Sequence, residues 1–129
     1  MMYECAKVFE FCAAHYNPQA GPEHHCSRLH GHSWAVRFVF QGMSLDHRAW
    51  LFDFGLIRDE LKPIVDSLDH RCLNDLFDFN PSAELLAQWF AEQVHLCLGL
   101  KMTERQVALT RVDVTEKAGD WGAWASYIR

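Results

Sequence analysis

The alternation of side chains between His30 and Gln41 is the feature that most constrains how this chain can fold. Successive side chains of a β-strand point to opposite faces, so residues two apart share a face. One face of this strand carries the even-numbered residues, namely His30, His32, Trp34, Val36, Phe38 and Phe40. The pattern predicts a long strand that ends at Gly42 and bears two histidines at its start.

Similar patterns predict five further elements. They are a strand over 3–14, a helix over 53–68, a helix from 80–81 to about 99, a strand over 106–115 and a closing strand over 123–128. Asp53 is expected to cap the first helix, and Pro63 is expected to kink it or divide it into two pieces. Asn80 is the expected N-cap of the second helix, with Pro81 at its first position and Gly99 near its end.

The order strand, strand, helix, helix, strand, strand (ββααββ) predicts an α+β fold, a four-stranded antiparallel sheet with two helices on one face. The 129 residues contain no repeat and no linker, so we expect a single domain over 1–129. Such a sheet has two edges and one open face, and exposed edges invite pairing with another copy. Together with 13% aromatic residues, this favours a closed oligomer over a monomer whose loops cover the edges.

The charge balance argues against two classes of partner. The chain has 12 Lys and Arg against 17 Asp and Glu, a net charge of -5 at pH 7. Nucleic acids and anionic membranes both bind basic surfaces, so we expect neither as a partner. The first residues form no signal peptide, and no apolar run approaches the roughly 18 residues of a spanning helix. These features predict a cytoplasmic protein.

Three histidines are candidates for a metal site. His30 and His32 point the same way from one strand, with Cα atoms about 6.5 Å apart, and His15 ends the adjacent strand. Three neutral nitrogen donors with one vacant position are typical of a catalytic zinc site, whereas a structural site usually has four ligands. The alternative is a set of ordinary surface histidines. His24 and His25 could compete as ligands, but they lie on a loop and are expected to stay solvated.

The cysteines form no C-x-x-C pair, and an odd number of five disfavours a disulfide framework. Four are expected to be small buried residues. Cys26 differs because its neighbours are polar, and a nearby cation would lower its pKa and supply thiolate. Asp69 beside His70 can fix the imidazole tautomer for acid–base work, although a helix-end charge pair is the plainer interpretation. Glu116 reads by default as a surface salt-bridge partner.

Taken in order, the motifs resemble the 6-pyruvoyl-tetrahydropterin synthase family, whose bacterial branch is 6-carboxy-tetrahydropterin synthase. They are Phe-Cys-Ala-Ala-His over 11–15, Cys-Ser-Arg-Leu-His-Gly-His-Ser over 26–33, Asp-Phe over 53–54, Leu-Asp-His over 68–70 and Asn-Pro-Ser-Ala-Glu over 80–84. The combination spans nearly the whole chain and is specific, whereas any single motif is not.

The resemblance implies the tunnelling fold, in which subunits with this order of elements close into an oligomeric β-barrel. It also implies a homohexamer, a dimer of trimers, with active sites between subunits. By position, the residues that bind Zn²⁺ would be His15, His30 and His32.

The resemblance further implies catalytic roles. Cys26 would be the catalytic thiolate, and Asp69 with His70 a proton relay that reaches in from a neighbouring subunit. Three residues would hold the pterin ring, namely Glu116, Pro81 and Ser82. The tail after Glu116 is unusually rich in tryptophan for this family, with Trp121 and Trp124.

The implied reaction converts 7,8-dihydroneopterin triphosphate to 6-carboxy-5,6,7,8-tetrahydropterin, acetaldehyde and triphosphate, in 7-deazaguanine (queuosine) biosynthesis. The alternative product is 6-pyruvoyl-tetrahydropterin, formed by eliminating triphosphate with the side chain whole. Two other classes stay open from the residues: a cysteine hydrolase built on Cys26, His70 and Asp69, and a non-catalytic zinc-binding protein.

Overall fold

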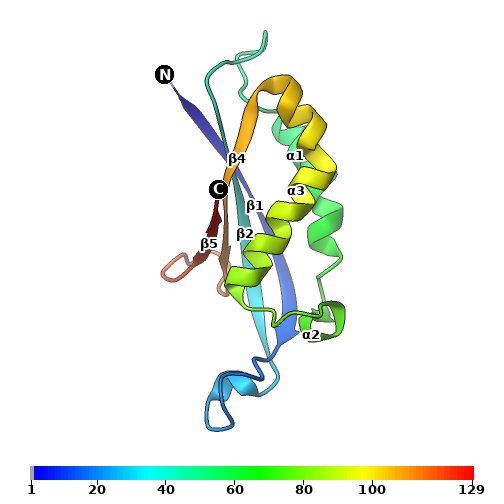
Figure 1. Cartoon of the computed structure of the whole chain (residues 1–129), viewed down its shortest axis with the longest axis vertical. Helices are drawn as coiled ribbons and strands as arrows, with labels where there is room; N and C mark the ends of the chain where they lie inside the picture. The colour runs from blue at the N-terminus through cyan, green and yellow to red at the C-terminus, as the bar shows by residue number, and fades with distance from the viewer. Residues whose placement is uncertain (1) are drawn as a thin grey trace.

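A five-stranded sheet forms one layer of the computed structural model, which describes residues 2–129 (Figure 1). The strand order is β3-β1-β2-β4-β5. The bounds are Tyr3–His15 for β1, His30–Gly42 for β2, Arg71–Cys72 for β3, Val107–Thr115 for β4 and Ala125–Ile128 for β5. The four strands predicted from the sequence are present and pair antiparallel.

The sheet is mixed rather than wholly antiparallel, because β3 runs parallel to β1. Two hydrogen bonds hold the chain there: the amide of Cys12 donates to Asp69 Oδ1 at 2.8 Å, and the amide of His70 donates to the carbonyl of Cys12 at 2.6 Å. A two-residue strand is too short to show an alternating pattern. The expectation of four strands was therefore wrong by this one edge strand.

Helices α1 (Phe54–Asp66) and α3 (Ala83–Arg105) cover the same face of the sheet (Figure 1). The prediction of two helices on one face is confirmed, with a short α2 (Leu73–Leu76) and a 3₁₀ turn, η1 (His25–Ser27), in addition. The loop that carries η1 projects from the end of the sheet between β1 and β2 (Figure 1).

Helix α1 begins as predicted but is not divided at Pro63. Asp53 Oδ1 accepts hydrogen bonds from the amides of Gly55 and Leu56 at 2.8 and 3.4 Å, which satisfies two free donors of the first turn. The helix runs through Pro63 because Leu61 and Val65 on either side of it are both buried in the core.

Helix α3 begins later and ends later than the sequence indicated. Ser82, rather than Asn80, is the N-cap, and its Oγ accepts from the Leu85 amide at 3.2 Å. The helix continues past Gly99 because Met102 is still buried, and that packing outweighs the cost of about 1 kcal/mol for a helical glycine. It ends at Gln106, whose φ of 53° is left-handed.

The core lies between the sheet and the two long helices. Its largest fully buried side chains include Trp34, Phe38 and Phe40 of β2, which confirms the even-numbered face of that strand as the core face. All five cysteines are free, and none is fully buried, so the expectation of buried cysteines was wrong. Strand alternation puts Cys12 on the open face, where it is exposed.

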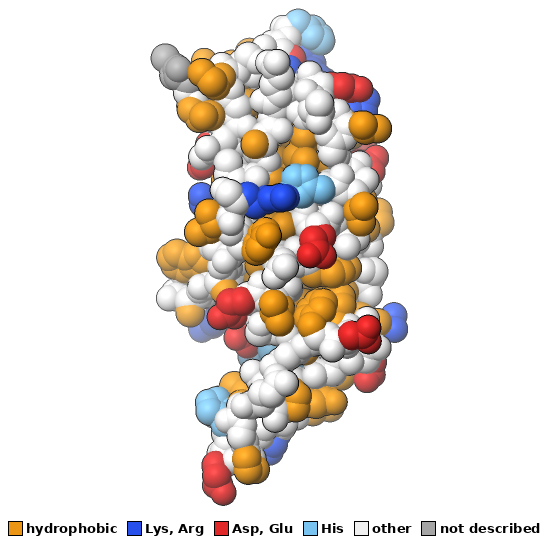
Figure 2. Space-filling view, in the orientation of Figure 1, with side chains coloured by type: hydrophobic (Ala, Val, Ile, Leu, Met, Phe, Trp, Pro, Cys, Tyr) orange, Lys and Arg blue, Asp and Glu red, His pale blue; other side chains and the backbone are white. Residues whose placement is uncertain are grey.

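The surface of this side of the molecule mixes the two signs of charge. Acidic and basic side chains are scattered among hydrophobic ones in Figure 2, and no basic patch forms on the face shown there. Within residues 2–129, no helix is both long enough and apolar enough to span a membrane.

Candidate active site

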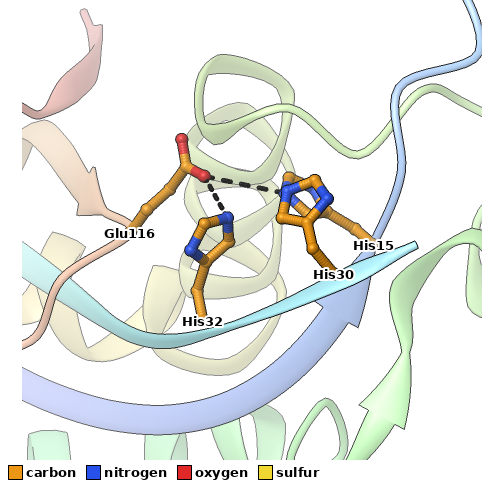
Figure 3. A group of neighbouring side chains, drawn as sticks. All are labelled: His15, His30, His32 and Glu116. Atoms are coloured by element: carbon orange, nitrogen blue, oxygen red, sulfur yellow. Dashed lines mark ion pairs between the residues drawn. The ribbon is translucent and has the colours of Figure 1, made fainter. Parts of the chain in front are cut away.

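Three imidazoles meet on the core face of the sheet, at the edge where β1 ends and β2 begins. His15 lies opposite His30 in the strand register, and His32 lies opposite Ala13, so all three point to one face. Their ring centroids are 4.7 Å apart for His15 and His30, 5.2 Å for His15 and His32, and 4.8 Å for His30 and His32. The structure therefore brings together the three histidines that the sequence singled out (Figure 3).

Backbone carbonyls set the tautomers of two of these rings. His15 Nδ1 lies 2.8 Å from the carbonyl oxygen of Pro81, and His30 Nδ1 lies 2.7 Å from that of Arg28. A carbonyl only accepts, so each Nδ1 carries a proton, and in the neutral ring the lone pair is then on Nε2. Such an outer contact is what orients metal-binding histidines in proteins.

The Nε2 atoms of His15 and His32 face the Glu116 carboxylate. Both atoms are buried, and neither has a hydrogen-bond donor among the residues described. Burial lowers the pKa of His32 more than the charge of Glu116 raises it, which favours the neutral ring. Buried nitrogen lone pairs without a donor are costly unless a cation uses them. This donor set fits Zn²⁺, which takes neutral imidazoles.

Glu116 joins the histidines from β4's end (Figure 3). Its Oε2 lies 2.5 Å from His32 Nε2 and 3.6 Å from His15 Nε2, and one ligand atom of each of the four residues lies within 4.8 Å of the others. The contact with His15 lowers the pKa of Glu116, against the opposite effect of burial. The sequence assigned Glu116 to the pterin ring; the structure also makes it a possible fourth metal ligand.

Cys26 lies outside this four-residue group. It stands on η1, half-buried, with its Sγ within 4.8 Å of ligand atoms of His24 and His25, which are both exposed. The Cys26 amide donates to His24 Nδ1 at 3.0 Å, and its carbonyl accepts from the Asn17 amide at 2.8 Å. The thiol is thus fixed through its backbone on the loop between the two long strands.

Asn80 ties that loop to the start of α3. Its Nδ2 donates to Asn17 Oδ1 and to Gln19 Oε1, both at 2.8 Å. The sequence around Asn80 predicts only a helix cap, because nothing in this local pattern points to residues more than 60 positions away. Its neighbour Pro81 orients His15, so one short segment supports both the loop and the histidine group.

Asp69 and His70 form a pair at the edge of the sheet. His70 Nδ1 lies 2.8 Å from Asp69 Oδ2, and the imidazole side chain is 81% exposed. The amide of Cys12, and then the contact with His70, hold the pKa of Asp69 below its ordinary value. His70 opens on a pocket of about 590 Å³ that Cys12 and Ser33 also line. Strand alternation puts those two side chains on the face opposite His15 and His32.

A second pocket, of about 430 Å³, lies beside the histidine group. Glu116 lines it together with Glu84, Thr115 and Trp124. Pro81 and Ser82, which the sequence assigned to the pterin, do not line this pocket; the Pro81 carbonyl accepts from His15 and the Ser82 hydroxyl caps α3.

Comparison with known proteins gives concordant matches. The family model described as 6-pyruvoyl tetrahydropterin synthase matches residues 4–127. A 6-carboxy-5,6,7,8-tetrahydropterin synthase of Bacillus subtilis (strain 168) is 31% identical over 105 residues, which cover 74% of this chain and 68% of that protein. The Synechocystis sp. protein of the same description is 35% identical over 94 residues, covering 68% and 71%.

Two further similarities are to a protein of another description and to a solved structure. A dihydroneopterin monophosphate aldolase of Pyrococcus furiosus is 33% identical over 66 residues, covering 51% of this chain and 55% of that protein. The structure of Caenorhabditis elegans 6-pyruvoyl tetrahydropterin synthase superposes with a TM-score of 0.78 at 19% identity, covering 100% of this chain and 96% of the other. At that identity the likeness shows the fold alone.

Proposed function

The chain belongs to the 6-pyruvoyl tetrahydropterin synthase family, and from that premise we propose that it is a zinc-dependent lyase acting on a dihydropterin triphosphate. The proposed reaction takes 7,8-dihydroneopterin triphosphate and one water to 6-carboxy-5,6,7,8-tetrahydropterin, acetaldehyde and triphosphate, in the 7-deazaguanine (queuosine) pathway. The names of the Bacillus and Synechocystis relatives support the carboxy product.

One observation carries the proposal: the converging histidines with carbonyl-bound Nδ1 atoms on His15 and His30. His15, His30 and His32 would hold the zinc, and Glu116 stands beside them. Bound zinc supplies Lewis-acid polarisation of the hydroxyl groups on the substrate side chain. Zinc binds imidazole in its neutral form, and burial lowers the pKa of His32, which favours that form.

The chain's own residues would move the protons. The Cys26 thiolate would take a proton from a side-chain carbon of the substrate, and His70, oriented by Asp69, would deliver a proton elsewhere on it. Glu116 would accept hydrogen bonds from the 2-amino and ring N–H groups of the pterin. Its lowered pKa keeps it ionised at neutral pH, and a carboxylate accepts hydrogen bonds more strongly than a carboxylic acid does.

We also propose that the enzyme is a homohexamer in which His70 serves the site of a neighbouring subunit. Two features support this: His70 opens on a pocket shared with open-face side chains, and β1 has a sheet partner on its outer side only at Ala13 and Ala14. Mixing two inactive variants, Cys26→Ala and His70→Ala, would then restore part of the activity, because some mixed sites would hold both native residues. Unrestored activity in a mixed hexamer would contradict the shared site.

The deciding experiment is anaerobic incubation of the zinc-loaded protein with 7,8-dihydroneopterin triphosphate, followed by mass analysis of the pterin and an acetaldehyde assay. Carboxy-tetrahydropterin with acetaldehyde is the expected result. A pyruvoyl product without acetaldehyde would assign the alternative branch with the same residues. A parallel incubation with the monophosphate addresses the substrate named for the Pyrococcus relative.

Controls separate the other classes. Chelation should abolish turnover by the lyase, whereas a cysteine hydrolase built on Cys26, His70 and Asp69 would stay active and be alkylated irreversibly at Cys26. Zinc binding without turnover of either pterin phosphate, and with Cys26→Ala altering only affinity, would leave a zinc-binding protein and overturn the proposed function.

A further inference from the structure

Trp124 is a large aromatic side chain that the fold leaves unused. It is 56% exposed, and in the part of the chain described here it takes part in no aromatic stack or cation–π contact. Its neighbour Trp121 is different, because the guanidinium of Arg37 lies 4.1 Å from its ring centroid. An exposed indole beside a pocket offers a planar ligand an apolar surface on which to stack.

The backbone around Trp124 is held in place. Thr115 Oγ1 donates to the carbonyl of Ala123 at 2.8 Å, and the amide of Gly122 donates to Asp120 Oδ1 at 2.9 Å. Ala125, the next residue, pairs with Val114 in the sheet. Trp124 therefore immediately precedes the start of β5, across from the end of β4, where Glu116 leaves the sheet.

Both residues line the pocket of about 430 Å³, together with Glu84. The pocket thus offers two kinds of recognition: carboxylate oxygens that accept hydrogen bonds, and the indole ring of Trp124. A pterin has matching features, because its flat bicyclic ring has π faces and its pyrimidine edge carries an amino group and a ring N–H. Stacking of a nucleobase-like ring on an aromatic side chain is favourable whatever the edge groups are.

We propose that Trp124 is the wall on which the pterin ring stacks, and so a specificity-determining residue for this enzyme. The inference rests on the proposed function, since it takes the substrate to be a pterin. Carboxylates alone would accept hydrogen bonds from any amino-pyrimidine edge, whereas an indole wall favours a planar fused ring. The pocket therefore selects the fused ring through Trp124 and orients it through Glu116.

The test is calorimetric titration of the zinc-loaded protein with oxidised neopterin, which binds as a pterin and is not a substrate, and separately with tripolyphosphate. The variants are Trp124→Leu, Trp124→Phe and the control Trp50→Leu. Trp50 is another exposed tryptophan (46% exposed), and it does not line this pocket. Trp124→Leu should weaken neopterin binding about tenfold, and Trp124→Phe by no more than about threefold. Trp50→Leu should change neither titration, and Trp124→Leu should leave tripolyphosphate binding as in the wild type.

The outcomes separate two failures. Wild-type protein that does not bind neopterin would overturn the pterin substrate, and this inference with it. Wild-type protein that binds, with Trp124→Leu binding equally well, would overturn the role of Trp124 alone. Gel filtration of the same samples checks the competing role: if Trp124→Leu changes the oligomeric state, the residue is a subunit contact and the inference fails.

Discussion

Replacing Asp113 by asparagine should destabilise the protein through a single buried charge. The carboxylate is fully buried on β4 and lies 2.8 Å from Arg37 Nε, 3.2 Å from Arg111 Nε and 2.6 Å from Ser126 Oγ. It therefore joins β2, β4 and β5. An amide of the same shape keeps one acceptor but loses the charge and turns two N–H donors toward a site that already holds only donors.

The expected loss is about 2–3 kcal/mol of unfolding free energy. Breaking a buried ion pair costs about 3–5 kcal/mol, and the value is lower here because the side chains of Arg37 and Arg111 are 26% and 37% exposed and can turn to water. Burial alone would raise the pKa of Asp113, but the hydrogen bonds from Ser126 and Arg37, with the charge of Arg111, hold it below its ordinary value.

The sign of the pH dependence follows from that lowered pKa. A carboxyl with a lower pKa in the folded state stabilises the fold fully above its unfolded pKa of about 3.9, and the stabilisation is lost as the pH falls through the folded value. The difference between wild type and Asp113→Asn should therefore be constant from about pH 5 to 7 and shrink below about pH 4.

Urea unfolding followed by far-ultraviolet circular dichroism measures the difference, at one protein concentration because oligomer stability depends on it. The matched control is Asp59→Asn, whose carboxylate is 67% exposed and pairs with Arg58 on the surface; it should change stability by no more than about 0.5 kcal/mol. A loss at Asp113 no larger than at Asp59, or a difference that grows on acidification, would refute this account of the network.

Three predictions concern the candidate site. His30→Ala should weaken zinc binding at least 10–100-fold, roughly the range for losing an outer contact alone. The control His47→Ala, at an exposed histidine, should leave the zinc content unchanged. Equal zinc retention by both variants would remove His30 from the ligand set. Asp69→Asn should lower kcat about a hundredfold without loss of zinc, since the imidazole loses its orienting charge, and an unchanged kcat would exclude the relay. Asn80→Ala should lower kcat about tenfold or more at full zinc content by releasing the Cys26 loop, and should speed limited proteolysis of that loop; neither effect being seen would make the Asn80 contacts irrelevant.

Two different kinds of structural support hold the residues of the candidate site in position. His30 and His32 stand on one long strand paired with β1 along its whole length, so their positions are set by the sheet. Cys26 and His70 stand on a loop and at a sheet edge, held by a few hydrogen bonds. We expect the metal ligands to tolerate loop substitutions that would misplace the proton-transfer groups.

Local periodicity was enough to predict the parts of the fold that depend on neighbours in sequence. The even-numbered face of β2, the Asp53 cap and the approach of His15 to His30 all follow from residues within one strand or one helical turn, or from the pairing of consecutive strands. The motifs along the chain were enough to identify the family.

The tertiary structure decided the features that join distant segments. Strand β3 forms because the backbone of Cys12 binds the side chain of Asp69 and the amide of His70, which lie 57 and 58 positions later in the chain. His15 is likewise oriented by the carbonyl of Pro81, 66 positions away. The Asn80 contacts, and the pocket shared by Trp124 and Glu116, arise in the same way. A period of 2 or 3.6 residues records only which side of an element faces the core; which polar atom meets which across the fold depends on how the elements pack.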